Sequence, residues 1–478
     1  MPSATIDEIR GTFADTGTET QNGYNRGLTM HTADGSARSV IKRDGNVVPF
    51  DRDRIATAIF KAAATVGGSD RATSEKLAAE VEQQLLPTYS KGAIPSVEDV
   101  QDMVEAVLIN NGHVRTSRAF IIYRHERAQA RAARMDRFEA TDNIPYKKIY
   151  EVLRWNMAHE CETVESLNEL IATGKFPELV HASNERYHNE VVKGAEKIIA
   201  RLPDIRIAII AGPSSSGKTT TTIKVGEALK KAGRELVAIN IDHYFFDLDH
   251  HPKDEFGDYD YETPQALDLD LINQHLVQLL EGKTIKTPHY DFKTGTRKLD
   301  VHELSLAPNQ ILLIDSLHGL YGDMTRDIPA ANKFRLYIET LGQLRDANDN
   351  FMRWADNRLL RRMIRDSWHR NLQPIQTLTH WHYVRRSELK NIIPFIGTAD
   401  YLVNSALPYE IPIHKAKLFS FFPKAMDMFR DEPKRQDAYI RARRVFELLD
   451  QITAVEDDSV VPKDALLREF IGGSVYKY

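Results

Sequence analysis

Residues 212–219 read Gly-Pro-Ser-Ser-Ser-Gly-Lys-Thr and match the phosphate-binding pattern G-x-x-x-x-G-K-[ST]. The apolar run 207–211 before this pattern has the length of a strand, and the sequence of 220–231 is compatible with a helix that ends near Gly233. A strand, a glycine-rich turn and a helix in this order direct backbone N–H groups and the positive end of the helix dipole at one anion. The alternative is a chance glycine-rich turn, and the flanking segments argue against it.

The same pattern predicts which side chains contact a nucleotide. Lys218 is expected to reach the β- and γ-phosphates, and the Thr219 hydroxyl is expected to bind Mg²⁺. The predicted cofactors are therefore ATP and Mg²⁺. The residues expected to surround ATP are Gly212, Pro213, Ser214, Ser215, Ser216, Gly217, Lys218, Thr219 and Thr220.

The length of 478 residues exceeds one ordinary core and predicts two or three domains. Apolar residues make up 42%, charged residues 27%, and the net charge is −5, so electrostatics favours neither nucleic acid nor a membrane surface as a partner. The single cysteine, Cys161, excludes an intramolecular disulfide and a cysteine-based zinc cluster. No apolar run reaches membrane-spanning length and the N-terminus lacks signal-peptide features, so a cytoplasmic location is expected.

Composition and pattern divide the chain into five parts. Residues 1–38 have few large apolar side chains and are predicted to form a disordered tail. A compact segment at 39–134, a helical connector at 135–203 and an α/β domain at 204–418 follow. The remainder, 419–478, is predicted to be a C-terminal helical segment. It contains an amphipathic helix with apolar positions at Tyr439, Ala442, Val445, Phe446 and Leu449.

The compact segment 39–134 begins with a predicted β-hairpin at 40–50, in which Asp44-Gly45 supplies the turn. Helical patterns follow, separated by Pro87, Gly92, Pro95 and Gly112. They cover 51–66, 71–87, 96–112 and 115–134. The segment is therefore expected to be a small, mostly helical domain with one hairpin.

Two acidic residues follow apolar strand patterns downstream of residue 219. Asp242 comes after 236–241, and Asp315 comes directly after 311–314. The carboxyl ends of parallel strands form the edge at which α/β sheets bind ligands, so Asp242 could accept a proton from a substrate hydroxyl. Asp315 has the form of a carboxylate that holds Mg²⁺. Taken alone, a capping or turn role is the alternative for Asp242.

Residues 356–366 predict an arginine-rich helix in which Arg358, Arg362 and Arg365 share one face. Guanidinium groups suit phosphate oxygens, so this helix could close over ATP and acceptor; a solvated face paired with nearby aspartates is the alternative. The polar, aromatic segment 288–297 could recognise an acceptor or form an ordinary surface hairpin.

These motifs resemble the uridine kinase/phosphoribulokinase family over about 205–418. The resemblance rests on the phosphate loop, Asp242, Tyr261–Asp268, Tyr290-Asp291-Phe292 and the arginine helix; 381–388, 399–401 and 404–410 look like its longer bacterial branch of uridine kinase-like nucleoside kinases. It implies an α/β P-loop kinase fold with a mainly parallel five-stranded sheet flanked by helices, Mg·ATP as donor and Asp242 as base. It also implies acceptor contacts from Tyr244, Glu262, Tyr290 and Arg297, and places Arg358, Arg362, Arg365 and Arg370 near the phosphates.

The chain departs from the family pattern at the residues that read a pyrimidine. Glu262 stands where uridine-cytidine kinases have aspartate, and Gly295 stands where they have histidine after Tyr-Asp-Phe. The strand before Asp315 ends in Asp-Ser instead of Glu-Gly, and Leu317-His318-Gly319 looks more like phosphoribulokinase. His318 and Arg370 are therefore added to the candidate acceptor contacts, and Arg365 to the catalytic ones. The phosphotransfer residues match, whereas the base-reading residues leave the base open.

The segment 39–134 resembles the ATP-cone, a regulatory nucleotide-binding domain. The resemblance rests on Lys42-Arg43-Asp44-Gly45, Phe50-Asp51 and the closing run 123–128. It implies that Lys42, Arg43 and Lys61 contact the phosphates of ATP or dATP. From the residues alone, a small helical docking domain with solvated basic side chains is the alternative. Such modules also serve assembly, and a homo-oligomer is expected.

Together these features predict an ATP-dependent kinase that phosphorylates a ribose-bearing acceptor, most simply the 5′-hydroxyl of a nucleoside, under control of the N-terminal module. Two alternatives stay open. One is a sugar or sugar-phosphate kinase, suggested by Leu317-His318-Gly319 and the arginines. The other is a nucleotide-sensing regulator without turnover, against which the set of Lys218, Asp242 and Asp315 argues.

Overall fold

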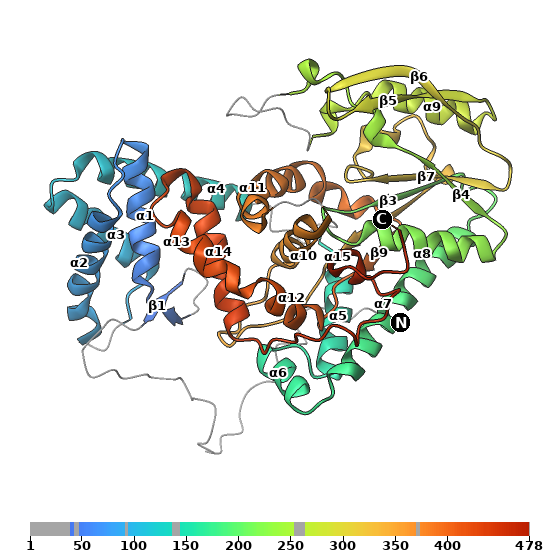
Figure 1. Ribbon diagram of the computed structural model, residues 1–478. Coiled ribbons are helices and arrows are strands. Elements are labelled where there is room, and N and C mark those ends of the chain that lie inside the picture. The colour runs from blue at the N-terminus through green and yellow to red at the C-terminus, as the bar shows by residue number, and fades with distance from the viewer. Residues whose placement is uncertain are drawn as a thin grey trace, which may run out of the picture. The chain divides into compact units, whose positions relative to one another are not determined.

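The structure is a computed structural model that describes residues 39–42, 47–90, 94–135, 144–252, 263–369 and 373–477. Its chain divides into two compact units (Figure 1). One contains the residues up to Ala62 together with Arg71–Ile121, and the other contains Ala63–Asp70 and everything from Ile122 onward. The predicted tail at 1–38 lies outside the described residues.

The N-terminal unit opens with the predicted hairpin. β1 (Ser39–Ile41) pairs antiparallel with β2 (Val47–Pro49), and Val40 lies opposite Val48. The Ile41 N–H donates to the carbonyl of Pro95 at 3.0 Å, which ties the hairpin to the start of a helix. The tip of the hairpin, including Arg43, lies outside the described residues.

Four helices follow close to the predicted positions: α1 (Arg52–Thr65), α2 (Arg71–Ser90), α3 (Val97–Asn110) and α4 (Val114–Met135). α2 continues to Ser90, past Pro87, where the sequence predicted its end, although Pro87 has no N–H to donate to the carbonyl four residues earlier. A core of small and branched side chains joins hairpin and helices, with Ile59, Ala78, Val81 and Val107 fully enclosed. The expectation of a hairpin followed by helices is confirmed.

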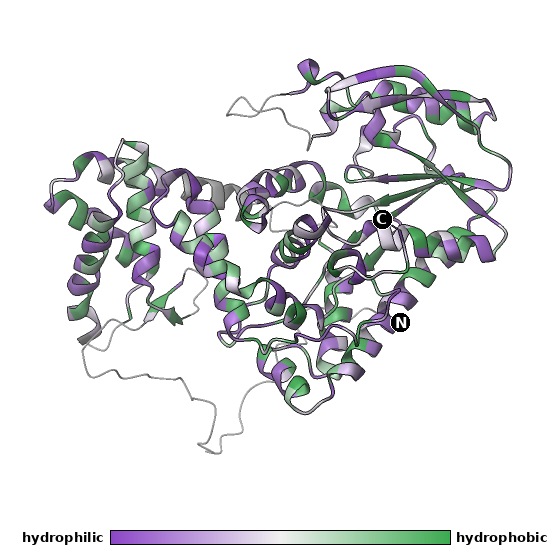
Figure 2. Ribbon diagram, in the orientation of Figure 1, coloured by the Kyte–Doolittle hydropathy of each residue, from purple (hydrophilic) through white to green (hydrophobic). Residues whose placement is uncertain are grey.

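The second unit is built on a five-stranded, wholly parallel sheet in the order β4-β7-β3-β8-β9. The strands are β3 (Ile207–Ala211), β4 (Glu235–Ile239), β7 (Gln310–Ser316), β8 (Lys333–Glu339) and β9 (Tyr401–Asn404). All residues of β3 are buried, and the central strands are mostly green in Figure 2. Such continuous apolar strands are typical of parallel sheets covered on both faces. The α/β fold predicted from sequence is confirmed.

Two cores cover the two faces of the sheet, because successive side chains of a strand point to opposite sides. Ala208 and Ile210 belong to the larger core, and Ile207, Ile209 and Ala211 belong to the smaller one. Helices that contribute to the larger core are α6 (Val164–Ala172), α7 (Phe176–Ile199), α8 (Lys218–Lys231), α10 (Trp354–His369), α11 (Pro374–Asn391), α12 (Glu410–Leu418), α13 (Phe422–Phe429), α14 (Gln436–Asp450) and α15 (Arg468–Ile471). The smaller core is closed by α9 (Leu269–Leu280) and the hairpin of β5 (Ile285–Asp291) and β6 (Thr296–Leu304).

Several sequence-based elements appear as expected. α14 buries Tyr439, Ala442, Val445 and Leu449, which confirms the amphipathic pattern. The connector contains α5 (Tyr146–Ala158), α6 and α7. The segment 288–297 lies in the β5–β6 hairpin and not in an irregular loop. The described 3₁₀ helices are η2 (Ile241–Tyr244), η3 (Leu248–His250), η4 (Pro264–Ala266), η5 (Gly322–Thr325), η6 (Ala330–Asn332), η7 (Ile393–Thr398), η8 (Phe419–Phe421) and η9 (Pro433–Arg435).

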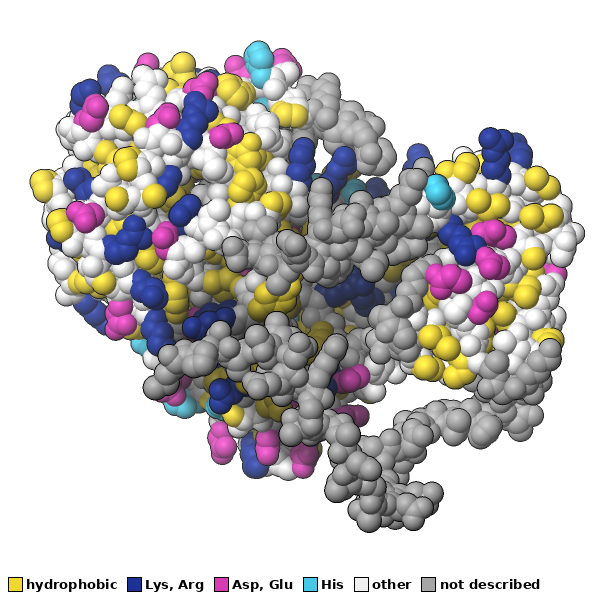
Figure 3. Space-filling view, turned by 180° about the vertical axis from the view of Figure 1, so that it is seen from behind, with side chains coloured by type: hydrophobic (Ala, Val, Ile, Leu, Met, Phe, Trp, Pro, Cys, Tyr) yellow, Lys and Arg dark blue, Asp and Glu magenta, His cyan; other side chains and the backbone are white. Residues whose placement is uncertain are grey.

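The surface carries mixed charge. On the face shown in Figure 3, Lys and Arg side chains alternate with Asp and Glu over the described residues, in keeping with a net charge of −5. Among the helices that the structure describes, none has the length and apolar character needed to cross a membrane. The ends of β3, β4 and β7 meet at one edge of the sheet, and that edge carries the candidate site.

Candidate functional site

The phosphate loop connects β3 to α8 and has glycine at two positions where a side chain would clash or strain the backbone. A Cβ at position 212 would lie 2.5 Å from the carbonyl oxygen of Ile338, so Gly212 allows the loop to pass against β8. Gly217 has a φ of +89° and caps α8. Ser215 also has a positive φ of +60°, an uncommon conformation for a residue with a side chain. The loop is thus held in a defined and partly strained shape.

Lys218 lies at the first position of α8 and folds back over the loop. Its Nζ donates to the carbonyl of Gly212 at 3.0 Å and lies 3.5 Å from that of Pro213. Burial lowers the pKa of Lys218, although the nearby carboxylates of Asp315 and Glu469 act in the opposite direction. A lysine clamped by backbone carbonyls has weak neutral partners, which a phosphate oxygen can replace.

Asp242 follows β4 on η2, where Asn240 Oδ1 accepts a hydrogen bond from its backbone N–H at 3.0 Å. Its side chain still contacts solvent, but the surrounding protein removes part of the water shell and raises the pKa of the carboxyl. Lys218 and His243 oppose this rise. Asp242 is therefore a carboxylate beside the phosphate loop whose proton affinity is increased.

Asp315 lies at the end of β7, next to β3 in the sheet, and is also open to solvent. Desolvation raises the pKa of this carboxyl, Lys218 lowers it, and the negative charges of Glu469 and Asp242 add to the rise. Thr222 Oγ1 lies 3.5 Å from Asp315 Oδ2. The structure thus brings Lys218, Asp242 and Asp315 together at one edge of the sheet.

The oxygen donors at this edge suit a magnesium ion. Thr219 is exposed at the start of α8, and the exposed Asp315 carboxylate interacts with Lys218, the residue next to Thr219. Mg²⁺ prefers oxygen ligands, keeps several waters and is usually held by one or two protein groups together with substrate phosphates. Within the described ranges, no group of three or more His, Cys, Asp or Glu could hold a metal by itself. The residues therefore fit an ion that arrives with a nucleotide.

The arginine helix α10 directs its predicted face at the phosphate loop. Arg362 Nη1 donates to Ser214 Oγ at 3.1 Å, and Arg358 Nη1 donates to the Ser214 carbonyl at 3.1 Å. Arg365 lies at the C-terminal end of the same face, 3.9 Å from a carboxylate oxygen of Glu469. The prediction of a shared face is confirmed by these contacts.

Most residues of α10 are buried, which differs from the solvated face that sequence reasoning left as the alternative to a lid. Arg358 is enclosed in an ion pair with Glu339 at 2.9 Å and in a second one with Glu388. Arg361 pairs with Glu410, and both side chains are fully buried. Carboxylates far away in the sequence stabilise these guanidinium groups inside the core. α10 therefore contacts the phosphate loop from within the protein core. A phosphate contact from Arg358 stays a prediction.

Arg358 also lines a cavity of about 590 Å³. Its lining includes Tyr337, Glu339, Trp381 and Arg385, so both aromatic faces and charged groups reach it. Its volume is in the range of small-molecule sites. Trp381 and Arg385 belong to the segment 381–388, which carried part of the family resemblance, and this segment therefore helps to line the cavity.

The predicted acceptor residues occupy different environments. Tyr244 is fully buried with its hydroxyl 2.8 Å from His275 Nδ1, and Tyr290 packs against Phe245, which places both in the smaller core. Arg297 donates to Asp268 at 2.9 Å, and His318 is buried behind Ser316. Tyr244 lies in the turn after β4 and Tyr290 in the β5–β6 hairpin, and both of these elements pack into the smaller core. Acceptor contacts from these four residues stay predictions, and Glu262 and Arg370 lie outside the described residues.

Sequence reasoning placed Thr220 near ATP but missed its carboxylate partner from the end of the chain. Thr220 N–H and Oγ1 donate to Glu469, 249 residues away, at 3.1 and 2.7 Å. It also missed the carboxylate partners of the arginines, Glu388 and Glu410. No local pattern signals pairs so distant, although both glutamates lie in segments that carried the family resemblance.

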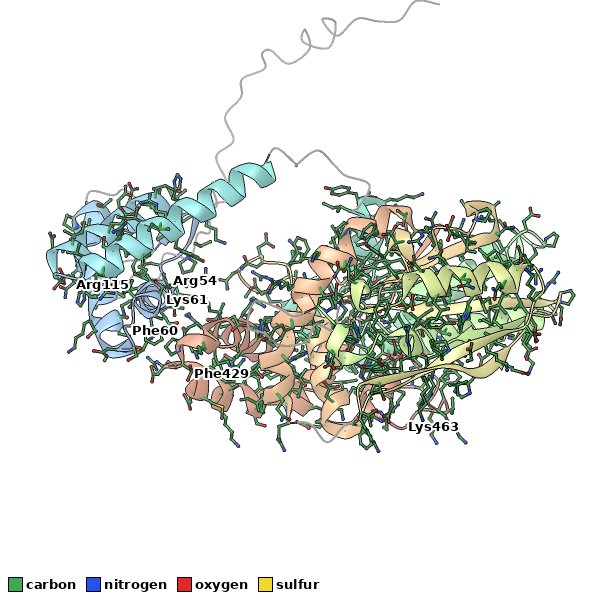
Figure 4. All side chains as sticks on the ribbon, turned by 90° about the horizontal axis from the view of Figure 1, so that it is seen from above. Arg54, Phe60, Lys61, Arg115, Phe429 and Lys463 are labelled. Atoms are coloured by element: carbon green, nitrogen blue, oxygen red, sulfur yellow. The ribbon has the colours of Figure 1, made fainter. Side chains whose placement is uncertain are left out.

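The N-terminal unit presents basic residues of its own. Lys61 and Arg54 are seven residues apart on α1 and are labelled together with Arg115 in Figure 4. Lys42, at the end of the hairpin, is partly exposed. Nucleotide contacts from Lys42 and Lys61 stay predictions.

Comparison with known proteins assigns both units. Residues 38–129 match the ATP cone domain, and 207–407 match the phosphoribulokinase / uridine kinase family. The uridine kinase of Staphylococcus aureus (strain Newman) is 30% identical over 158 residues, which cover 33% of this chain and 67% of that protein. The chain belongs to the phosphoribulokinase / uridine kinase family.

Other relatives carry the same description. The uridine kinase of Bacillus pumilus is 32% identical over 158 residues, or 33% of this chain and 66% of that protein, so the match spans slightly less than two thirds of its length. Among solved structures, a possible uridine kinase from Bacillus stearothermophilus aligns with a TM-score of 0.31 and 15% identity over 45% of this chain and 98% of that one. The family assignment thus rests on sequence, and the parallel sheet with its phosphate loop agrees with it.

Proposed function

We propose that this protein transfers the γ-phosphate of ATP to the 5′-hydroxyl of a nucleoside. The observation that carries the proposal is the position of the Asp242 carboxylate, with its raised pKa, beside Lys218 of the phosphate loop. Relatives described as uridine kinases support a nucleoside as the acceptor.

In the proposed reaction the loop amides and Lys218 hold the triphosphate. The acceptor hydroxyl oxygen attacks the γ-phosphorus while Asp242 takes the hydroxyl proton, the bond to the β-phosphate oxygen breaks, and ADP leaves. The raised pKa of Asp242 favours uptake of that proton. Arg362 and Arg365, on the face of α10 that looks at the loop, would stabilise negative charge on the transferring group. Thr219 and Asp315 would hold Mg²⁺, which neutralises phosphate charge when bound.

The experiment is an acceptor screen with the purified full-length chain. ADP release is measured with Mg·ATP and each of the common nucleosides, and with pentoses and pentose phosphates, because the sequence left sugar acceptors open. The proposal expects turnover that depends on a nucleoside. Turnover only with a sugar or sugar phosphate would show that the acceptor is a sugar and not a nucleoside. If none of the acceptors in the panel stimulates ADP release, the proposal is contradicted.

We also propose that the N-terminal unit binds ATP or dATP and adjusts this activity, and that the chain forms a homo-oligomer. The match of 38–129 to the ATP cone domain supports a nucleotide there. The same screen run with and without dATP, together with the molar mass in solution under both conditions, tests regulation and assembly in one experiment.

A further inference from the structure

The end of the chain returns to the phosphate loop. Residues 461–477, here called the C-terminal segment, contain the short helix α15 (Arg468–Ile471), and Figure 1 shows α15 beside α10 and close to the start of α8. Leu466, Leu467 and Phe470 in this segment are fully buried in the larger core. The sequence assigned the segment no role.

Glu469 is the residue of α15 that reaches the phosphate loop. One carboxylate oxygen of Glu469 accepts hydrogen bonds from the Thr220 backbone N–H at 3.1 Å and from Thr220 Oγ1 at 2.7 Å. Glu469 is only 4% exposed. The N–H groups of the first turn of a helix have no partners within the helix, and the helix dipole favours negative charge there. A carboxylate therefore binds at the N-terminal end of α8, the place to which the loop geometry would direct a phosphate.

The charge of Glu469 also reaches the catalytic candidates. It lies 3.9 Å from Arg365 on the helix face that looks at the loop. It also raises the pKa of Asp315 and opposes the lowering of the pKa of Lys218. A negative charge at this place thus has the same neighbours, Thr220, Arg365 and Lys218, that a nucleotide phosphate would need.

Neighbouring side chains hold the carboxylate in place. Leu466 lies against Gly217, where a Cβ would come within 2.6 Å of its Cδ1. The Phe470 ring lies below the guanidinium groups of Arg361 and Arg365, with its centroid 5.0 and 5.8 Å away. The C-terminal segment thus packs against the phosphate loop through Leu466 and against α10 through Phe470.

We propose that the Glu469 carboxylate and a nucleotide phosphate compete for the same donors at the start of α8, so that ATP binding requires the α15 turn to move. The proposal rests on ATP binding at the phosphate loop, as in the proposed function. A phosphate and a carboxylate cannot share the Thr220 donors, because two anions in contact repel each other. A carboxylate displaced from the Thr220 donors cannot stay buried without partners, because an unpaired buried charge is costly. The turn that carries Glu469 must therefore move with it. Glu469 is therefore a positioning residue that sets the affinity for nucleotide.

Glu469→Gln tests this inference with a side chain of nearly the same shape and no charge. Binding of Mg·ATP and of inorganic tripolyphosphate is measured by calorimetry without any acceptor, so the result is independent of turnover. Lys218→Ala is expected to lose nucleotide binding at the loop, so the binding that remains in this variant measures the contribution of the N-terminal unit. Because Glu469→Gln removes the charge-assisted hydrogen bond between the competing side chain and Thr220, we expect the Kd of both ligands to be about tenfold lower in this variant.

The matched control is Asp464→Asn, an exposed acid of the same segment that pairs with Lys224 at 3.2 Å. It is expected to leave both Kd values within about twofold, the scale of an exposed ion pair. An unchanged or higher Kd in folded Glu469→Gln would overturn the inference and make Glu469 a supporting wall of the site. Absence of any loop-site binding in wild type and variant alike would overturn it together with the proposed function.

A second measurement needs no variant. Hydrogen exchange of the wild-type chain is compared with and without saturating Mg·ATP. Movement of the turn predicts faster exchange of the amides at 466–472, at least twofold, while the loop amides are protected. Slower or equal exchange at 466–472 with a protected loop would overturn the inference, because the turn would then stay in place beside the bound nucleotide.

Discussion

At the scale of single residues, Asp242 joins a raised pKa to a position beside the phosphate loop. We predict that Asp242→Asn lowers kcat by about 10²- to 10⁴-fold, because the acceptor proton has no base, while the Kd for ATP changes little. In the wild type, activity should fall as the pH drops through the raised pKa, and so at a pH above the ordinary value of 3.8. Steady-state kinetics and ATP titration measure both. Asp249→Asn, at an exposed acid on η3, is the control; full activity in Asp242→Asn would remove this residue from the base role.

His414 on α12 offers a stability prediction. Its ring is fully buried, and neither ring nitrogen has a hydrogen-bond partner among the residues that the structure describes. Burial lowers its pKa to about 4 despite the carboxylate of Glu410 at 3.9 Å. The unfolded chain takes up a proton near pH 6.5, whereas the folded chain does so only near pH 4, so stability falls as the pH drops between these values.

The expected loss from this one group is about 2 kcal/mol between pH 7 and pH 5. His414→Leu should remove that part of the pH dependence, which urea unfolding at the two pH values measures. An equal loss of stability in wild type and variant would show that His414 does not titrate in this way.

At the scale of elements, α10 depends on carboxylates brought to it by α11 and α12. Arg361 and Glu410 are both fully buried, and Arg361 also reaches the Ser405 carbonyl at 2.6 Å. We predict that Arg361→Met lowers the free energy of unfolding by about 3–5 kcal/mol, because Glu410 is left as a buried charge. The double variant Arg361→Met/Glu410→Met should recover much of that loss. Chemical denaturation of the single and double variants decides, and additive losses would contradict the coupling.

The elements themselves were largely predictable, because strand and helix patterns are local. The runs before Gly212 and at 311–314 became β3 and β7, and the face of α10 was read correctly from the spacing of its arginines. Their surroundings were not predictable. Whether Arg361 meets solvent or Glu410, or whether Thr220 meets Glu469, depends on packing between segments up to 249 residues apart. The sequence therefore located the loop and its acids but not the charges that enclose them.

At the scale of the whole molecule, the chain combines two units that both match nucleotide-binding families. We predict that wild type binds two ATP molecules per chain. Lys218→Ala should bind one, since the loop site loses the lysine that is predicted to contact the phosphates. The double variant Lys42→Ala/Lys61→Ala should also bind one, and it should lose any response of turnover to dATP while keeping basal turnover.

Calorimetry of wild type, the two variants and their combination measures the number of sites, and Lys76→Ala, an exposed lysine on α2, is the control. Binding of one ATP by wild type and none by Lys218→Ala would show that the N-terminal unit binds no nucleotide. Binding of one ATP by wild type that persists in Lys218→Ala would instead place the nucleotide in the N-terminal unit alone. Only two sites that are lost separately support a chain in which one unit senses the nucleotide that the other consumes.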